Sequence, residues 1–145
     1  MRIVRMERNS IAVMELRVFL VEDLANMRVL MEELFSSFGG LRVAGTAATE
    51  AEARLWLEQH EGQWDLMIVD LVLSQGSGFG VIESAARQRP HGEIVAFSGY
   101  ASSGVRERCL QLGASAAFDK AQTTEFLRWL SAFAAGKDES SSRSP

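Results

Sequence analysis

The fold of this chain is decided by the stretch Leu66-Met67-Ile68-Val69-Asp70, in which four apolar residues lead directly into an acid. Such a run is apolar on both faces of a strand, which is typical of a parallel strand buried between two layers of helices. Asp70 then stands at the carboxyl end of the strand, where open parallel sheets bind their ligands. The stretch therefore predicts both a buried sheet and a candidate site at its edge.

Three other apolar runs also end on polar residues. In chain order these are Glu22-Asp23 after residues 18–21, Ser98 after residues 94–97, and Asp119-Lys120 after residues 116–118. Each has an ordinary interpretation on its own, because acids and serines often cap helices or form turns, and lone lysines are usually solvated. The carboxyl ends of parallel strands meet at one edge of a sheet, so the four strand ends together favour a functional site.

Apolar runs and helical patterns alternate five times, which predicts an α/β fold with a five-stranded parallel sheet, (βα)5. The strands are expected at residues 16–21, 41–45, 66–69, 93–97 and 116–118. A first helix is expected over residues 26–38, with one wide apolar stripe made of Met27, Leu30, Met31, Leu34, Phe35 and Phe38. Thr49 and Glu52 have the spacing of a capping box, which predicts that a second helix begins there and ends near His60.

We take the sheet order 2-1-3-4-5 from the flavodoxin-like class of doubly wound folds. This order places Asp23 opposite Asp70, and two carboxylates about 5 Å apart repel by roughly 3 kcal/mol at an effective dielectric of about 20. Such a cluster favours a bound cation. Carboxylate oxygens suit Mg²⁺, whereas no Cys or His stands in position to favour zinc. Lys120 and Ser98 would offer an ammonium and a hydroxyl to an anion beside the cation.

Composition narrows the class of protein. The 145 residues are 47% hydrophobic, which suits one globular domain, and the net charge of -4 argues against generic nucleic-acid binding. The single cysteine, Cys109, fits a buried position in a reduced compartment. No apolar run reaches the length of a membrane span, and Glu15 and Arg17 interrupt the only stretch that resembles a signal peptide. We expect a cytoplasmic protein with its domain over residues 15–135, a poorly ordered extension over residues 1–14 and a disordered tail over residues 136–145.

Four motifs occur in one order along the chain. They are Phe19-Leu20-Val21-Glu22-Asp23, Trp64-Asp65-Leu66-Met67-Ile68-Val69-Asp70-Leu71-Val72-Leu73 with Gly78, Ser98-Gly99, and Gly113-Ala114 through Lys120. With these motifs, residues 16–135 resemble the response-regulator receiver domains of two-component signalling, in particular the single-domain, chemotaxis-regulator-like members. The motifs are similar to that family's acidic pair, phosphoacceptor strand, hydroxyl switch position and lysine strand.

The resemblance implies a role for each residue of the candidate site. Asp70 would accept a phosphoryl group as an acyl phosphate, and Lys120 and Ser98 would bind the phosphoryl oxygens. Glu22, Asp23, Asp70 and the main-chain oxygen of Val72 would hold Mg²⁺. The donor would be a phosphohistidine on a sensor histidine kinase or a histidine phosphotransfer protein.

Three positions depart from the family pattern. Ser74 stands where the family usually has proline, Ala117 takes the place of the aromatic switch residue, and Ala121 follows the lysine where proline is common. Because a non-proline cis bond costs about 2.5 to 4 kcal/mol, we expect either a strained cis bond between Lys120 and Ala121 or a shifted loop there. The family's coupled movement of the serine and the aromatic side chain then either is absent from this chain or uses Tyr100 in place of the missing aromatic residue.

The predicted output is protein–protein contact with a downstream target, through the face formed by the fourth helix, the fifth strand and the fifth helix. We expect no output module after the last helix. Phe126 and Trp129 on that helix either complete the core or form a partner face, in which case a homodimer is one arrangement. No nucleic acid or membrane partner is expected.

The leading hypothesis is thus a stand-alone phosphoacceptor that assists its own phosphorylation and is not a turnover enzyme. A phosphorylation-independent adaptor with the same fold is the alternative, and Ala117 and Ala121 are the residues that support it. A phosphatase or a flavin carrier of the same topology is a third class. A phosphatase of this kind would use a second acid two residues beyond Asp70, where the chain has Val72.

Overall fold

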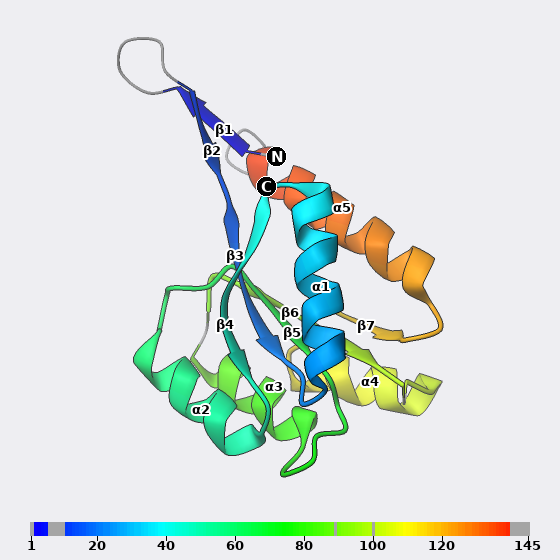
Figure 1. The fold of residues 1–145 in the computed structure, drawn as a ribbon. Coiled ribbons are helices and arrows are strands. Elements are labelled where there is room, and N and C mark those ends of the chain that lie inside the picture. Colours follow the sequence, from blue (N-terminus) through cyan, green and yellow to red (C-terminus); the bar gives the residue numbers. More distant parts are fainter. Residues whose placement is uncertain (1, 6–10, 89, 100, 140–145) are drawn as a thin grey trace.

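Five parallel strands form one sheet at the centre of the molecule (Figure 1). The computed structural model describes residues 2–5, 11–88, 90–99 and 101–139. The strands are β3 (Leu16–Val21), β4 (Leu41–Ala47), β5 (Leu66–Val69), β6 (Glu93–Ser98) and β7 (Ala116–Asp119). Their order in the sheet is β4-β3-β5-β6-β7, which confirms the predicted order 2-1-3-4-5 and the flavodoxin-like fold class.

Five helices cover the two faces of this sheet. They are α1 (Ala25–Phe38), α2 (Glu50–Gln59), α3 (Gly78–Arg87), α4 (Ser103–Leu112) and α5 (Thr123–Glu139). Figure 1 shows α1 and α5 on one face and α2, α3 and α4 on the other. Alternate residues of β3 illustrate the two layers, because Leu20 packs in the core beneath α1 and α5 while Phe19 packs in the core beneath α2 and α3. Both are buried, as a strand between two helix layers requires.

The register of the strands brings their carboxyl ends to the same level. Val21 pairs with Val69, and Val69 in turn pairs with Ala96 of the next strand. The residue after each strand continues the pattern: the Asp70 N–H donates to the carbonyl of Val21 at 3.0 Å, and the Lys120 N–H donates to the carbonyl of Ser98 at 2.8 Å. The polar residues that follow the strands therefore begin from fixed backbone positions.

Helix α1 buries less of its apolar stripe than the sequence predicted. Met31 and Phe35 are buried against the sheet and α5, but Leu30 is 57% exposed and Phe38 is 37% exposed. The apolar stripe is wider than the part of the α1 surface that packs against the sheet and α5. Leu30 and Phe38 lie on the uncovered margin of this stripe.

The two ends of the chain contain regular structure that the sequence did not predict. Strands β1 (Arg2–Arg5) and β2 (Ile11–Met14) pair antiparallel, where a poorly ordered extension was expected. Both segments contain β-branched residues, which favour extended pairing. Helix α5 continues to Glu139, into the segment that was expected to be a tail. Residue 1, residues 6–10 and residues 140–145 of these predicted segments lie outside the described residues.

Within the part of the chain that the structure describes, no helix is both long enough and apolar enough to cross a membrane.

Candidate functional site

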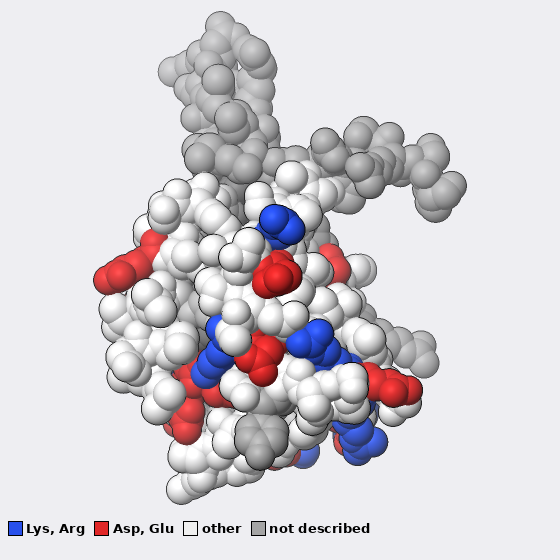
Figure 2. All heavy atoms as spheres, turned by 90° about the vertical axis from the view of Figure 1, so that its right-hand side faces the viewer, with Lys and Arg blue, Asp and Glu red and all other residues white. Residues whose placement is uncertain are grey.

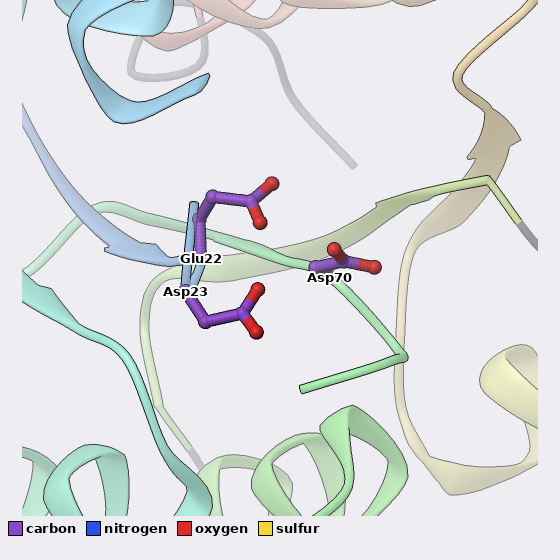
Figure 3. Close-up of side chains that lie close together, drawn as sticks. All are labelled: Glu22, Asp23 and Asp70. Atoms are coloured by element: carbon purple, nitrogen blue, oxygen red, sulfur yellow. The ribbon is translucent and has the colours of Figure 1, made fainter. Parts of the chain in front are cut away.

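Three carboxylates meet at the carboxyl edge of the sheet. Glu22 and Asp23 follow β3, Asp70 follows β5, and one oxygen of each lies within 4.8 Å of the others. Figure 3 shows the three side chains gathered around one space beside the strand ends. Glu22 is 3% exposed and Asp70 6% exposed, while Asp23 is half-buried at the open side of the cluster. The structure thus brings together the three acids that the sequence placed at this edge.

Lys120 and Ser98 both contact Asp70. The Lys120 ammonium lies 3.1 Å from Asp70 Oδ2 and 3.1 Å from Glu22 Oε1, so it bridges two of the three acids. The buried Ser98 hydroxyl donates to Asp70 Oδ1 at 2.8 Å, and the Val72 N–H donates to the same oxygen at 3.2 Å. Residues at the ends of β5, β6 and β7 therefore converge on one carboxylate.

The pKa values of Glu22 and Lys120 are both raised in this cluster. Burial raises the pKa of the Glu22 carboxyl above its ordinary value, and repulsion from Asp70 adds to this, although the hydrogen bond and charge of Lys120 offset part of the rise. Burial alone would lower the pKa of Lys120, but its hydrogen bond to Glu22 and the charges of Asp70 and Glu22 outweigh burial and raise it. One lysine therefore stays charged and does not fully neutralise the acids.

The donor set fits a hard divalent cation. Three carboxylates face one space, and within the described residues this is the group whose oxygens lie close enough together to hold an ion. Oxygen ligands without Cys or His suit Mg²⁺. The backbone of the acidic loop is also held in place, because the Arg28 guanidinium donates to the Glu22 carbonyl at 2.6 Å. The sequence assigned no role to Arg28.

The loop after Asp70 is built to approach the acids closely. Gly78 packs against the backbone of this loop, where an added Cβ would lie 2.2 Å from the Asp70 carbonyl oxygen, so only glycine fits. The Ser74 N–H donates to Asp23 Oδ2 at 2.9 Å. Proline has no N–H and could not make this bond, so Ser74 gives the loop a contact to a candidate metal ligand that proline would lack.

The family model described as "Response regulator receiver domain" matches residues 18–129. The chain belongs to this family. The receiver domain is also 32% identical over 108 residues to a protein-glutamate methylesterase/protein-glutamine glutaminase of Bdellovibrio bacteriovorus. That match covers 73% of the chain and 30% of the relative, so the chain spans less than a third of that protein's length, and the methylesterase activity is a property of that protein.

Solved structures show the same fold. A two-component response regulator of the LuxR family from Aurantimonas sp. SI85-9A1 has a TM-score of 0.74 at 23% identity, covering 84% of this receiver domain and 86% of that chain. The CheX-CheY-BeF3-Mg+2 complex from Borrelia burgdorferi has a TM-score of 0.70 at 18% identity, covering 81% of this chain and 90% of that one. These similarities confirm the flavodoxin-like receiver fold.

The peptide bond between Lys120 and Ala121 is trans in this receiver domain. Of the two arrangements expected there, the cis bond is therefore wrong.

A hydrogen-bonded link connects the segment after β7 to α4. Gln122 Oε1 accepts the Asp119 N–H at 3.0 Å and is also contacted by the Arg106 guanidinium. Arg106 Nε donates in addition to the Ala101 carbonyl at 3.0 Å. The sequence contained no signal for this link, because Arg106 and Gln122 belong to none of the four motifs named above.

The predicted partner face is corrected at Phe126. Its side chain is 1% exposed and stacks on Phe97 with ring centroids 4.1 Å apart, so it belongs to the core beneath α5. Helix periodicity could not separate the buried side of α5 from a neighbouring exposed one. Trp129 is half-buried and stacks on Phe133 at 5.5 Å, and its role in partner binding stays a prediction.

Proposed function

We propose that this receiver domain accepts a phosphoryl group on Asp70, and that the position of Lys120 is the observation that carries the proposal. A lysine 3.1 Å from both Glu22 and Asp70 lies where an anion transferred to Asp70 would need a counter-charge. A purely structural ion pair would need only one acid. The donor would be a phosphohistidine on a sensor histidine kinase or histidine phosphotransfer protein.

The reaction is a transfer between two nucleophiles. A carboxylate oxygen of Asp70 forms the new bond to phosphorus while the bond from phosphorus to the donor's imidazole nitrogen breaks, and the electron pair of that bond returns to the imidazole. The product is an acyl phosphate on Asp70. Phosphoryl transfer of this kind depends mainly on positioning and on neutralising the equatorial oxygens, and it requires little other chemistry from the protein.

The roles of the surrounding side chains follow from their contacts. Lys120 would move its ammonium from the two carboxylates to a phosphoryl oxygen, and the Ser98 hydroxyl, now 2.8 Å from Asp70 Oδ1, would donate to another. Glu22, Asp23, Asp70 and the carbonyl of Val72 would hold Mg²⁺, which supplies positive charge to the phosphoryl oxygens when bound. The solved structure of CheY from Borrelia burgdorferi, which has a similar fold, is a complex with CheX, BeF3 and Mg+2. It supports this assignment by analogy.

The proposed output surface is formed by α4, β7 and α5. Figure 2 shows this side of the molecule, on which acidic and basic side chains are interspersed rather than gathered into one patch of a single sign. Such a surface is suited to a protein target and gives no electrostatic support for nucleic acid. Trp129 would contribute to this surface, either toward a downstream protein or toward a second copy of the chain. The cytoplasmic location expected from the sequence stays a prediction.

The proposal is tested by incubating the protein with Mg²⁺ and a small acyl-phosphate donor, followed by intact mass measurement. The wild type is expected to acquire one phosphoryl group and Asp70→Asn none. Asp65→Asn is the matched control, because Asp65 lies at the opposite end of β5, where it accepts hydrogen bonds from Arg17, and this variant is expected to react like the wild type. A wild type that acquires no phosphoryl group, or Asp70→Asn that still does, would contradict the proposal.

A phosphorylation-independent adaptor is the second candidate, and Ala117 is the observation that favours it. This small residue on the half-buried edge strand β7 provides no aromatic side chain to change position with Ser98. The same incubation separates the two functions, because an adaptor would acquire no phosphoryl group. In a separate binding measurement, an adaptor would also bind its partner equally well as the wild type and as Asp70→Asn.

A further inference from the structure

Glu50, at the start of α2, holds the loop that follows the phosphoacceptor strand. We define the β5–α3 loop as residues 70–77. Glu50 Oε1 accepts the Ser77 N–H at 2.8 Å, and the Glu50 N–H donates to the Gln75 carbonyl at 3.2 Å. The other carboxylate oxygen pairs with Arg54 at 2.6 Å. With its side chain only 22% exposed, Glu50 is bound on both sides and stays in one position.

Two glycines leave the space that the Glu50 carboxylate fills. At Gly76 an added Cβ would lie 2.3 Å from Glu50 Cβ, and at Gly80 it would lie 2.2 Å from Glu50 Oε2. Gly76 also has φ of +81°, a conformation that other residues rarely adopt. Ser77 is the N-cap of α3, so the carboxylate is also placed at the positive end of that helix. The loop sequence therefore accommodates Glu50 in particular.

The same loop carries backbone groups of the candidate metal site. The Val72 N–H contacts Asp70 Oδ1 and the Ser74 N–H contacts Asp23 Oδ2. Val72 is also bridged antiparallel to Ser77, the residue whose N–H Glu50 holds. A displacement of Ser77 would therefore shift Val72, whose carbonyl is a proposed Mg²⁺ ligand. The loop is fixed by Asp23 at one side and by Glu50 at the other.

We propose that Glu50 is a positioning residue, which holds the β5–α3 loop in the shape that the acids and the Val72 carbonyl need to bind Mg²⁺. The inference rests on the proposed function, since it requires a divalent cation at Glu22, Asp23 and Asp70. Its physical basis is preorganisation. A loop with Ser74 in the place of proline has more conformations to lose on binding, and a fixed Ser77 removes much of that freedom beforehand.

The test measures the dissociation constant of Mg²⁺ by isothermal titration calorimetry, without any phosphoryl donor. Glu50→Ala is expected to weaken Mg²⁺ binding about tenfold, at the lower end of the range for residues that orient metal ligands. Glu50→Gln keeps an oxygen for the Ser77 N–H and is expected to weaken binding less than Glu50→Ala does. The amides of residues 74–77 should also exchange hydrogen faster in Glu50→Ala.

Glu52→Ala is the matched control on the same turn of α2. Glu52 accepts the Ala48 N–H at 2.9 Å and stabilises the start of the helix, but among the described residues it makes no hydrogen bond to the β5–α3 loop. Its removal is expected to lower the melting temperature and to leave the Mg²⁺ dissociation constant unchanged. A loss of affinity that is equal in Glu52→Ala and Glu50→Ala would attribute the effect to helix stability and overturn the proposal.

Gly80→Ala provides a second variant that leaves Glu50 in the chain. Its new methyl group would displace the Glu50 carboxylate, so it is expected to weaken Mg²⁺ binding several-fold in the wild type. In the Glu50→Ala background, where the space is empty, it should have no further effect. Equal effects of Gly80→Ala in both backgrounds would contradict the proposal.

The possible failures are distinguishable. If the wild type and Glu50→Ala bind Mg²⁺ equally, this inference fails and the proposed function stands. If the wild type binds no Mg²⁺, the proposed function fails and the inference fails with it. If Glu50→Ala does not fold, Gly80→Ala in the wild type decides, and unchanged affinity in that variant would overturn the role of Glu50.

Discussion

The Ser98 hydroxyl donates a hydrogen bond of 2.8 Å to Asp70 Oδ1, and both side chains are buried. The acceptor oxygen also receives the Val72 N–H, so the Asp70 carboxylate has a fixed orientation in the resting protein. Its second oxygen is held by Lys120 at 3.1 Å. This carboxylate is therefore positioned by groups from three different strand ends before any phosphoryl donor arrives.

Ser98→Ala is expected to lower the free energy of unfolding by about 1 kcal/mol, because one buried hydrogen bond is lost while Asp70 Oδ1 keeps the Val72 N–H. Phosphoryl uptake from a small acyl-phosphate donor should also slow. Urea denaturation and the rate of phosphorylation measure the two effects. Ser115→Ala, at an exposed position, is the control and should change neither quantity. Wild-type stability in Ser98→Ala would show that the hydrogen bond contributes nothing.

Mg²⁺ is expected to raise the melting temperature, and a chelator to reverse the rise. A ligand that binds only the folded state adds about 2.7 kcal/mol of stability at a concentration one hundred times its dissociation constant. Asp23→Asn should be more stable than the wild type without Mg²⁺, because one of three crowded negative charges is gone, and should gain less from added Mg²⁺. Thermal unfolding without and with Mg²⁺ measures both the difference between the two proteins and the stability that each gains from the ion. An equal gain in both proteins would exclude Asp23 as a ligand.

Phe35→Ala and Leu30→Ala test the orientation of α1. Phe35 is buried, so its truncation should cost about 3 to 5 kcal/mol of stability, whereas Leu30 is more than half exposed and its truncation should cost less than about 1 kcal/mol. Chemical denaturation of the two variants measures the difference. Comparable losses would mean that Leu30 is buried in solution, for example beneath a second copy of the chain.

Alkaline pH should selectively destabilise the protein through Cys109. Burial raises the pKa of this thiol above its ordinary value of 9.0. As the pH rises past 9.0 the thiol ionises in the unfolded chain but stays protonated in the folded one, so the folded state loses stability. At neutral pH, Cys109→Ala should be less stable than the wild type by about 1 kcal/mol, from lost apolar burial. That gap should narrow above pH 9.0 in urea denaturation series, and a constant gap would contradict the shift.

The sheet and the acids were predictable because they rest on local patterns. An apolar run interrupted only by Arg17 predicted β3 residue for residue, and an uninterrupted one predicted β5. The acids that follow these strands needed only the strand order to be placed together. The strand order itself came from the fold class. Once that order holds, β3 and β5 are parallel neighbours, so Asp23 and Asp70 follow the same edge of the sheet and lie close together.

The parts that could not be predicted depend on contacts between distant segments. Glu50 and Ser77 are 27 residues apart, and the donor is a backbone N–H, which carries no residue identity in the sequence. The Ser74 N–H on Asp23 is hidden for the same reason. The exposure of Leu30 depends on how α1 crosses the sheet, and helix periodicity shows only that a face is apolar.

The link from Arg106 to Gln122 has a mechanical consequence. Because one amide oxygen of Gln122 engages both the Asp119 backbone and the Arg106 side chain, the segment after β7 and the first turns of α4 are tethered to each other across the edge of the sheet. A shift of Lys120 toward a phosphoryl group on Asp70 would displace the neighbouring Asp119 and Gln122, and with them Arg106. The displacement would pass to α4 on the outside of the sheet through the Arg106 guanidinium, without an aromatic side chain at position 117.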